Sequence, residues 1–449
     1  MFAAALLLCI CIWLVIVLLK SGRPKNFPPG PPAVPVLGNL LNLNLENPLK
    51  DFERLRKSYG NVYSLFLGRK PVVFINGFHA IKEALVTKAA DFSGRPRDIF
   101  VVDVTQGKGL VLADYGPFWK EHRRFALMTL RNFGLGKNTM EDRIHGEIQH
   151  IIKTLDNNIG KSMSPQVMFH NAASNIICQV LFGTRYEYDD KFIKEVVRCF
   201  MENSKIANGP WSVVYDSYPI VRKLPLPFKK AFKNFEICKN LTSNLVNEHK
   251  KTRVPGDPRD FLDCYLDELD KVRVCVCLYR WNVYIPCTYM KSVSLFDDRH
   301  NMPYMQAVVH EVQRVANTAP LSVFHCTSKD TELMGYSIPK GTMIVPNLTS
   351  VLNEEGQWKF PHDFNPENFL SDQGEFVKPE AFMPFSTGPR MCLGEGLARM
   401  ELFLIMVTLL KKFKFLWPED AGEPDYTPEF GVTLTPKPYR MKIKHREMQ

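Results

Sequence analysis

The sequence predicts a mainly α protein with small β-sheets, an α+β fold, and three observations support this prediction. Amphipathic helix patterns interrupted by prolines fill most of residues 140–270, with apolar residues spaced by about one helical turn. Near the start of the chain, two short strand-like runs, VYSLFLG and PVVFING, lie between helical segments, so we expect a small sheet packed on helices. A long apolar helix pattern occupies residues 397–413.

The composition is that of a globular protein with reduced cysteines. The chain has 449 residues, of which 45% are hydrophobic and 23% charged, which is ordinary for a folded domain. The net charge of +10 favours acidic partners or an anionic membrane surface, and no basic tail or aromatic-rich basic tract predicts nucleic-acid binding. The eleven cysteines are scattered and odd in number, without paired CxxC motifs, which indicates free thiols rather than a disulfide framework.

Residues 1–20 are predicted to anchor the chain in a membrane. An uninterrupted apolar run of 18 residues, FAAALLLCICIWLVIVLL, is long enough for a marginal membrane span. Lys20, Arg23 and Lys25 follow it, and positive charge after a span keeps that side in the cytoplasm. A cleaved signal peptide is the alternative, but the run is long for one and no positive segment precedes it.

Residues 21–40 are predicted to be a basic, proline-rich hinge between the anchor and a main folded domain at 41–449. The prolines of FPPGPPAVPVLGNL cannot join a helix and favour a stiff, extended backbone. We therefore expect a rigid hinge that holds the domain at a set angle to the membrane.

The stretch FSTGPRMCLG, which begins at Phe385, places one cysteine in a setting that suits a metal thiolate. Cys392 precedes the long apolar helix, whose free N–H groups and dipole stabilise a thiolate. Gly388 and Gly394 carry no Cβ, so the backbone can turn tightly and approach a flat cofactor. Phe385 can shield the sulfur from water, and Arg390 can pair with an anion. An isolated cysteine is more often a buried structural residue, but the whole stretch favours a ligand.

This stretch resembles the haem-thiolate signature of the cytochrome P450 family, and all five fixed positions of that signature match. The resemblance implies a cytochrome P450-like fold, haem (iron protoporphyrin IX) as cofactor and Cys392 as the axial iron ligand. It also implies a monooxygenase that inserts one oxygen atom of O2 into a small apolar molecule, because a thiolate ligand favours O–O cleavage. The chain has no GxGxxG or flavin motif, so electrons are expected from a separate NADPH-cytochrome reductase.

The proline-rich segment after the anchor resembles the microsomal branch of this family, which oxidises drugs and fatty acids. The resemblance therefore implies a xenobiotic or fatty-acid-like substrate and an endoplasmic reticulum membrane location, with contacts to membrane lipid. The remaining basic side chains of the predicted helix that opens with WKEHRRF, and of the residues just after it, are expected to form a docking surface for the reductase: Lys120, Arg124, Arg131 and Lys137.

Five residues fall where family members bind the haem propionates, and we call them the propionate set: Arg95, Trp119, Arg123, His325 and Arg390. Trp119 and Arg123 lie four residues apart on a predicted helix and therefore share a face. On residue type alone, the arginines would more often form a solvated basic face and the histidine an ordinary core position. The resemblance favours the propionate-binding role.

Glu311 and Arg314 lie in a helical run at a spacing that permits an ion pair. Such pairs are common on surfaces, but this one matches the Glu-x-x-Arg helix of the family, which implies a structural ion pair beneath the haem. The family's usual third partner is an arginine. Here the corresponding segment is Pro-Glu-Asn-Phe, so that arginine is absent or replaced by the amide of Asn368.

Four residues are expected to lie nearest the substrate by resemblance: Leu321 and Val323 in PLSVFH, and Gly431 and Val432 in the C-terminal turn. The substrate itself and the position oxidised on it are not specified by these residues.

Residues 271–295 depart from the family pattern. The family has a long central helix over the distal face of the haem there, with an Ala/Gly-Gly-x-Asp/Glu-Thr motif whose acid and hydroxyl deliver protons. This segment is rich in Val and Tyr, Pro286 interrupts it, and the motif is absent from the whole sequence. Its cysteines lack the histidine or paired CxxC of a metal site. We therefore expect a fold that is incomplete at the central distal helix, as in an alternative splice form or an error in the gene model, and no proton-delivering pair is assigned.

This departure leaves two alternatives to a reductase-driven monooxygenase. One is a membrane-anchored, haem-binding or misfolded variant without activity. The other is a haem-thiolate enzyme that uses peroxide or rearranges its substrate without a reductase.

Overall fold

The computed structural model describes residues 23–132, 138–273, 295–431 and 433–447. The predicted anchor at 1–20 and most of the departing segment at 271–295 lie outside these residues. Within the part of the chain that is described, no helix combines the length and the hydrophobicity that a membrane span requires.

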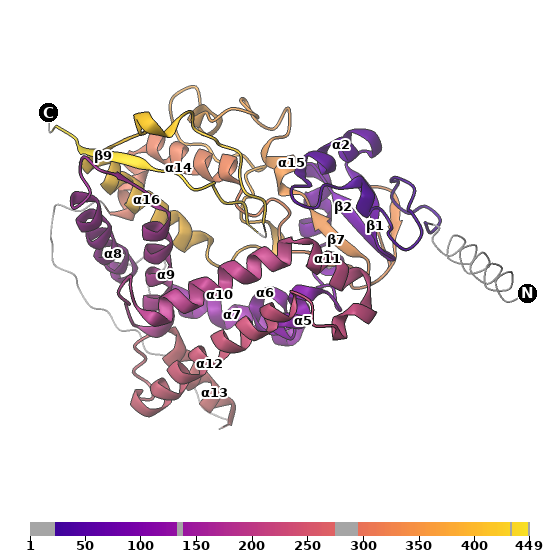
Figure 1. The fold of residues 1–449 in the computed structure, drawn as a ribbon, viewed down its shortest axis with the longest axis horizontal. Helices are drawn as coiled ribbons and strands as arrows, with labels where there is room; N and C mark the ends of the chain where they lie inside the picture. Colours follow the sequence, from indigo (N-terminus) through magenta and orange to yellow (C-terminus); the bar gives the residue numbers. More distant parts are fainter. Residues whose placement is uncertain (1–22, 133–137, 274–294, 432, 448–449) are drawn as a thin grey trace, which may run out of the picture.

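The fold is mainly α with small sheets, as predicted (Figure 1). The helical pattern of residues 140–270 corresponds to a series of helices with short connections, and the pattern at 397–413 becomes the long helix α16. The helices are α2 (Leu49–Tyr59), α3 (Phe78–Lys82), α4 (Ala89–Phe92), α5 (Phe100–Thr105), α6 (Gly109–Leu112), α7 (Pro117–Asn132), α8 (Asn138–Asp156), α9 (Gln166–Phe182), α10 (Lys191–Asn208), α11 (Pro210–Ser217), α12 (Lys229–Thr252), α13 (Phe261–Arg273), α14 (Pro303–Ala316), α15 (Leu348–Leu352) and α16 (Glu395–Lys412).

Three small sheets accompany these helices. The largest has the strand order β1-β2-β7-β4, in which β1 and β2 are the antiparallel hairpin expected from the two strand-like runs and β7 joins β2 in parallel. A second sheet has the order β3-β9-β8, and β5 pairs with β6. The strands are β1 (Val62–Leu67), β2 (Lys70–Ile75), β3 (Ser162–Met163), β4 (His325–Cys326), β5 (Thr331–Leu333), β6 (Tyr336–Ile338), β7 (Met343–Pro346), β8 (Phe413–Leu416) and β9 (Met441–His445).

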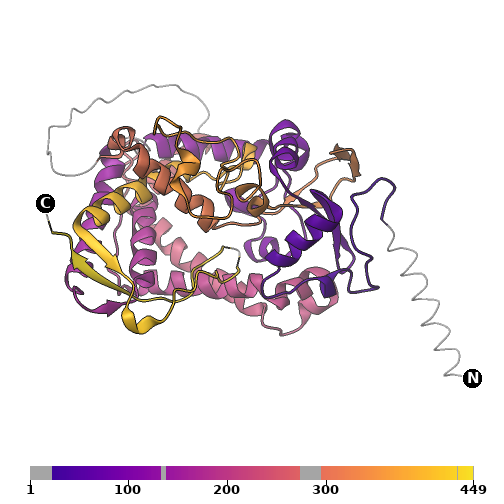
Figure 2. The same cartoon turned by 90° about the horizontal axis from the view of Figure 1, so that it is seen from above.

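The two larger sheets lie at opposite ends of the molecule. Figure 1 shows β1, β2 and β7 beside α2 and α15 at one end, and β9 close to α8 and α16 at the other. The view from above shows the same separation, with the C-terminal strand in yellow far from the indigo N-terminal sheet (Figure 2). The long helices occupy the space between the sheets.

The proline-rich segment predicted as a hinge packs against β1. The Arg23 Nε donates a hydrogen bond to the Ser64 Oγ at 2.9 Å, and that hydroxyl donates to the carbonyl of Pro28 at 2.7 Å. The buried Asn39 side chain accepts from the backbone N–H of Phe66 at 2.8 Å. The described part of this segment is therefore fixed to the sheet.

Helix α16 is at the centre of the helical core. Apolar residues occur all around it, a pattern typical of a helix that is buried on every side. Met400 and Leu404 of α16 pack in one apolar cluster with Ile144 and Ile148 of α8 and with Ile176 of α9. The chain segment that enters this helix, which contains Cys392, is thereby set on a rigid support.

Candidate functional site

The cysteine loop is closed by a backbone hydrogen bond between its two ends. The N–H of Cys392 donates to the carbonyl of Phe385 at 2.9 Å, and the N–H of Met391 donates to the carbonyl of Gly388 at 3.1 Å. Cys392 lies two residues before Gly394, the N-cap of α16, and it is exposed. The loop thus presents the sulfur at the surface of a rigid turn, close to the N-terminal end of a helix.

The two glycines of the loop have different surroundings. Gly388 has a φ of +74°, and a Cβ there would lie 1.9 Å from the carbonyl oxygen of Leu85. Glycine is therefore required because the loop contacts the backbone of the π-helical turn at Glu83–Thr87. Around Gly394, by contrast, a Cβ would meet no described atom within 4 Å. Both glycines were predicted to let the backbone come close to a flat cofactor. The space beside Gly394 is open, whereas the space beside Gly388 is filled by the backbone of Leu85.

The structure brings the arginines and the tryptophan of the propionate set together. The Arg390 guanidinium lies 4.1 Å from the centre of the Trp119 ring, and the Arg123 guanidinium lies 5.5 Å from the same ring. Arg123 also donates through Nη2 to the carbonyl of Met391 at 2.5 Å, so it contacts the cysteine loop directly. Helix α7 and the loop are joined at this point, although Arg123 and Met391 are far apart in the sequence.

Arg390 is held by two hydrogen bonds and keeps one nitrogen unpaired. Its Nε donates to the carbonyl of Ser93 and its Nη2 to the carbonyl of Ala113, both at 2.9 Å. Its Nη1 is buried without a hydrogen-bond partner among the described residues. Because an unpaired buried donor costs about 1–3 kcal/mol, this nitrogen marks a place where an acceptor is needed.

Arg95 adds a third guanidinium group to this cluster of like charges. Arg95 is 5% exposed and donates through Nη1 to the carbonyl of Phe324 at 2.8 Å. Burial, with a smaller contribution from the nearby Arg390, lowers the pKa of Arg95 to about 9. Burial lowers the pKa of Arg390 to about 10, and Arg123 contributes to that decrease. Each arginine is still charged at neutral pH, so the cluster carries positive charge that is poorly compensated within the protein.

Trp119 and His325, which were predicted to contact the propionates, already donate an N–H group to a backbone carbonyl of the protein. The Trp119 indole N–H donates to the carbonyl of Leu110 at 2.9 Å, and the His325 Nδ1 bonds the carbonyl of Phe92 at 2.7 Å, which requires the proton to be on Nδ1. Burial lowers the pKa of His325 to about 3, with Arg95 adding to the effect. A neutral ring with this tautomer offers only a lone pair at Nε2, so His325 must gain a proton before it can donate to a carboxylate.

The residues present fit a planar, dianionic, metal-containing cofactor such as haem. Three arginines converge beside the cysteine loop, one of their nitrogens lacks an acceptor, and Cys392 offers an exposed sulfur. In the part of the chain that is described, the carboxylate acting on both Arg95 and Arg390 is Asp114. Asp114 is also paired with Arg97 at 3.1 Å, so further carboxylates are needed to offset the positive charge, and haem propionates would provide them.

Asp114 and Tyr115 were not found by sequence reasoning. The Asp114 Oδ1 accepts from the backbone N–H of Arg95 at 3.2 Å, and the Tyr115 ring lies 5.8 Å from the Arg390 guanidinium. No spacing rule links these residues to the loop, because the contacts arise from how α6, α7 and the loop pack.

The core ion pair, Glu311 with Arg314, is present in α14 and fully buried. The Arg314 Nε and Nη2 donate to the Glu311 carboxylate at 2.7 and 2.8 Å, and both side chains are 0% exposed. The remaining Arg314 nitrogen donates to the carbonyls of Leu352 at 2.7 Å and Pro361 at 2.8 Å. The Asn368 Nδ2 donates to the Glu311 Oε1 at 3.2 Å, so an amide occupies the third position.

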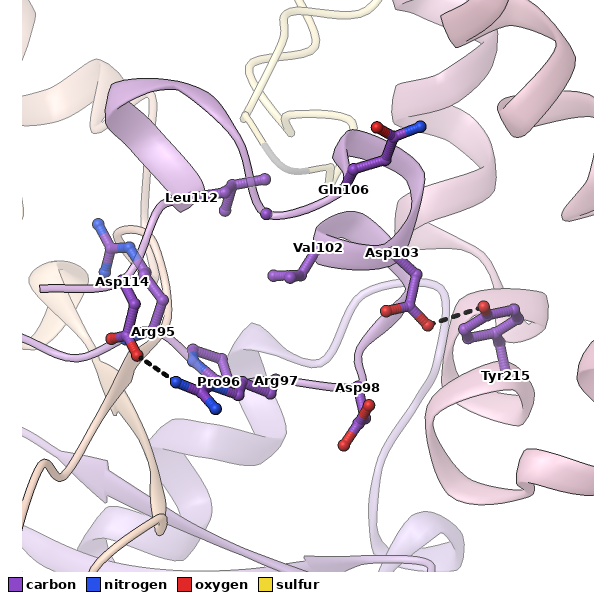
Figure 3. Close-up of a pocket in the computed structure, with 11 residues that line it drawn as sticks. Arg95, Pro96, Arg97, Asp98, Val102, Asp103, Gln106, Leu112, Asp114 and Tyr215 are labelled. Atoms are coloured by element: carbon purple, nitrogen blue, oxygen red, sulfur yellow. Dashed lines mark hydrogen bonds and ion pairs between the residues drawn. The ribbon is translucent and has the colours of Figure 1, made fainter. Parts of the chain in front are cut away.

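The assignment of four residues to the substrate pocket remains a prediction, and three of the four lie in the described part of the chain. Leu321 packs against the apolar cluster of the N-terminal sheet, Val323 accepts through its carbonyl from Arg95 at 3.3 Å, Gly431 is partly exposed, and Val432 lies outside the described residues. The described cavity of about 500 Å³ near Arg95 is bounded by α5, α6 and α11, and its lining does not include these residues (Figure 3).

Comparison with known proteins identifies the family. The family model for cytochrome P450 matches residues 28–273 and 291–443, which is most of the chain. The residues between the two matched parts, 274–290, lie inside the segment where the sequence lacks the central helix. The break in the match and the missing motif therefore coincide.

The curated relatives are mammalian cytochromes P450 of similar length. Cytochrome P450 2F2 of mouse (Mus musculus) is 37% identical over 459 aligned positions that cover 93% of each protein. Cytochrome P450 2F3 of goat (Capra hircus) is 36% identical over 489 positions that cover 99% of each. Cytochrome P450 2J2 of human (Homo sapiens) is 36% identical and covers 94% of this chain and 92% of its own length.

The goat alignment has 489 positions and this chain has 449 residues, so at least 40 positions have no residue here. This shortfall agrees with the loss of a long segment. The comparisons nevertheless confirm the predicted family, the enzyme class and the haem cofactor, and they do not favour the non-catalytic alternative. The chain belongs to the cytochrome P450 family of haem-thiolate monooxygenases.

Proposed function

We propose that this protein is a microsomal monooxygenase that holds haem through Cys392 and the propionate set and oxidises a small apolar xenobiotic or a fatty acid. The observation that carries the proposal is the cluster of three arginines beside an exposed cysteine, with the Arg390 Nη1 buried and unpaired. This combination provides a thiolate ligand and an anion site within one rigid loop.

The residues around the loop have distinct roles in this proposal. When bound, haem supplies the redox chemistry that activates dioxygen, with electron density provided by the cysteine thiolate. Arg390 and Arg95 neutralise the cofactor's carboxylates, and Arg390 supplies the unused Nη1 donor. The Trp119 ring holds the Arg123 and Arg390 guanidinium groups in place through cation–π contacts. No residue is assigned to proton delivery, because the motif that performs it in the family is missing.

Electrons are proposed to arrive from an NADPH-cytochrome reductase that docks on α7. Members of the family use a redox partner, and the sequence offers no flavin motif of its own. Lys120, Arg124 and Arg131 are exposed on α7, the helix that carries Trp119 and Arg123, and the fourth predicted docking residue, Lys137, lies outside the described residues. An acidic partner would be steered to this surface, which lies on the same helix as two members of the propionate set.

The apolar run at residues 2–19 supports an anchor in the endoplasmic reticulum membrane, with the main domain on the cytoplasmic side. The length of the run, the basic residues after it and the microsomal branch that the proline-rich segment resembles carry this part of the proposal. Expression of a fluorescent fusion with and without residues 1–20 tests it. Loss of membrane association after the deletion is expected, and unchanged association contradicts the anchor.

Product formation with NADPH and purified reductase tests the proposed function. The full chain is supplied with haem and assayed with lauric acid, a fatty acid, and with an alkoxycoumarin, a xenobiotic. We expect oxidation of at least one of them, and we expect the Cys392→Ser variant to fall to background. Cys238→Ser is the matched control, because that cysteine lies on α12, away from the loop. Equal activity in Cys392→Ser contradicts the proposal.

A further inference from the structure

Two cysteines of neighbouring long helices lie side by side, outside the site described above. Cys199 belongs to α10 and Cys238 to α12, and both are free. Their side chains are close enough to interact, since Cys199 is one of the groups that raise the pKa of Cys238. No part of the haem site uses either residue.

The packing of α10 against α12 gives independent support for this proximity. The Asn234 Nδ2 donates to the Asn203 Oδ1 at 3.0 Å, and the Asn203 Nδ2 donates to the carbonyl of Ala231 at 3.3 Å. Cys199 comes four residues before Asn203, and Cys238 comes four residues after Asn234. In an antiparallel pair of helices, one turn back along the first helix lies opposite one turn forward along the second. The register of the asparagine contacts therefore places the two cysteines opposite each other.

The two sulfurs differ in their access to solvent. Cys199 is 0% exposed, and the Arg198 Nη2 lies 3.3 Å from its Sγ. Cys238 is half-buried and borders a surface cavity of about 500 Å³ along α12. Polar and cationic residues of α12 line this cavity beside Cys238: Lys239, Thr242, Ser243, Asn247 and Lys250. A small anionic molecule can therefore reach Cys238, while Cys199 is covered and placed to react second.

We propose that Cys199 and Cys238 are a redox-active pair that forms a disulfide between α10 and α12, with glutathione disulfide or a similar small anionic disulfide as the oxidant. The lysines of the cavity match the carboxylates of such a molecule. In a reducing compartment the bond is transient and reports the redox state rather than serving as a permanent crosslink.

The exchange proceeds in two steps that balance. Cys238 loses its thiol proton to solvent, and its sulfur attacks one sulfur of the small disulfide, whose other half leaves as a thiolate. Cys199 then loses its proton, its sulfur attacks the Cys238 Sγ, and the second small thiolate leaves. Overall, two protein thiols lose two protons and two electrons, and one small disulfide becomes two thiols.

The surroundings make this exchange faster at higher pH. Burial is the main cause that raises the pKa of Cys238 to about 11; Cys199 and Glu195 contribute to this increase, and Arg198 acts in the opposite direction. On α12 itself, Lys239 is the adjacent charged group. Because the thiolate is the attacking form, the rate of crosslinking is expected to increase as the pH rises from neutral toward that value.

Peptide mapping of the full, haem-loaded chain tests the pair directly. The folded protein is incubated with glutathione disulfide, its remaining thiols are alkylated, and it is digested with trypsin without reduction. Cleavage after Arg198, Lys205, Lys233 and Lys239 yields the peptides CFMENSK and NFEICK. We expect these two peptides to be joined by a disulfide that dithiothreitol removes. Recovery of both as alkylated or glutathione-bound peptides overturns the proposal, as does a link found only between two chains.

Matched variants and melting curves provide the second readout. Cys199→Ala and Cys238→Ala are each expected to abolish the joined peptide, whereas Cys326→Ala, which removes a cysteine of β4, leaves it unchanged. The oxidised wild type should melt at a higher temperature than the reduced protein, because the crosslink restricts the unfolded chain. This difference should vanish in the Cys238→Ala variant. Equal melting of a fully crosslinked sample overturns the claim that the bond ties the helices.

Discussion

Arg314 and Arg390 are both buried arginines, but their surroundings are opposite. Arg314 faces the Glu311 carboxylate and donates further to several backbone carbonyls, so each of its guanidinium nitrogens is bonded. Arg390 faces the like charges of Arg123 and Arg95 and keeps its Nη1 without a partner. The first arrangement is complete within the protein, whereas the second is completed by a bound anion. A buried arginine whose donors are all paired within the protein indicates a structural ion pair, whereas a buried arginine with an unpaired donor indicates a binding site.

The largest effect on stability is expected from Arg314→Met. The change leaves the Glu311 carboxylate buried without its cation, which costs about 3–5 kcal/mol. Urea unfolding of the full chain, followed by circular dichroism, measures the loss. The double variant Glu311→Gln/Arg314→Met should recover part of it, because no unpaired charge remains. A loss below about 1 kcal/mol contradicts the description of the core ion pair as a closed structural unit.

Arg390→Gln should instead act mainly on the cofactor. One charge-assisted hydrogen bond contributes about 1.5–3 kcal/mol, so haem affinity is expected to fall by about tenfold to a hundredfold. Haem transfer to an excess of apomyoglobin measures the change. The control is Arg124→Gln, which removes an exposed arginine of α7 and should leave haem affinity unchanged. A large loss of stability with unchanged haem affinity would make Arg390 a structural residue like Arg314.

Asn368→Leu tests the third position of the core network. The Asn368 side chain donates to Glu311 and accepts from the backbone N–H of Phe360 at 2.8 Å. Its loss leaves a buried N–H unpaired and costs about 1–3 kcal/mol. Asn368→Asp should cost more, because it places a second carboxylate against Glu311. If thermal unfolding ranks Asn368→Asp as the more stable of the two variants, the amide has no such role.

The smallest effect is expected from the pH dependence of the haem-free protein. Because burial lowers the pKa of His325 to about 3 from an ordinary value of 6.5, the unfolded chain binds this proton more readily than the folded one. The free energy of unfolding therefore decreases as the pH falls below about 6.5. At one pH unit below that value, His325 accounts for a loss of about 1 kcal/mol.

His325→Asn keeps a donor toward Phe92 and should flatten that pH dependence. His310, whose pKa burial lowers to about 4, contributes in the same pH range and is present in both proteins, so the difference between them isolates His325. In the haem-bound protein a carboxylate near His325 favours its protonation, and the pH dependence should weaken. Identical pH profiles of wild type and variant contradict this account.

The sequence predicted the parts of the site that depend on fixed local spacing. The signature around Cys392 and the three-residue step from Glu311 to Arg314 are local, so the helix and loop geometry follows from the residues themselves. The tertiary partners were not predictable in the same way. Gly388 meets the backbone of Leu85, and Asp114 lies beside Arg95 and Arg390, because distant segments pack there.

The substrate contacts assigned by resemblance remain predictions. Leu321 packs on the N-terminal sheet and the Val323 carbonyl accepts from Arg95, and neither contact follows from a local sequence pattern. The pairing of Cys199 with Cys238 also lacks a sequence signal, since the register of two helices joined by a long connection decides it. Such contacts depend on tertiary packing, which a single sequence specifies only weakly.

The ferrous–carbon monoxide difference spectrum of the purified, haem-loaded full chain tests the central claim most directly. The claim is that the loop before α16 supplies a thiolate ligand and an anion site even though residues 271–295 depart from the family. The account predicts the red-shifted Soret band of a thiolate-ligated haem, and its loss in Cys392→Ser. A chain that takes up no haem, or one that shows the spectrum of a histidine-ligated haem, would contradict the account.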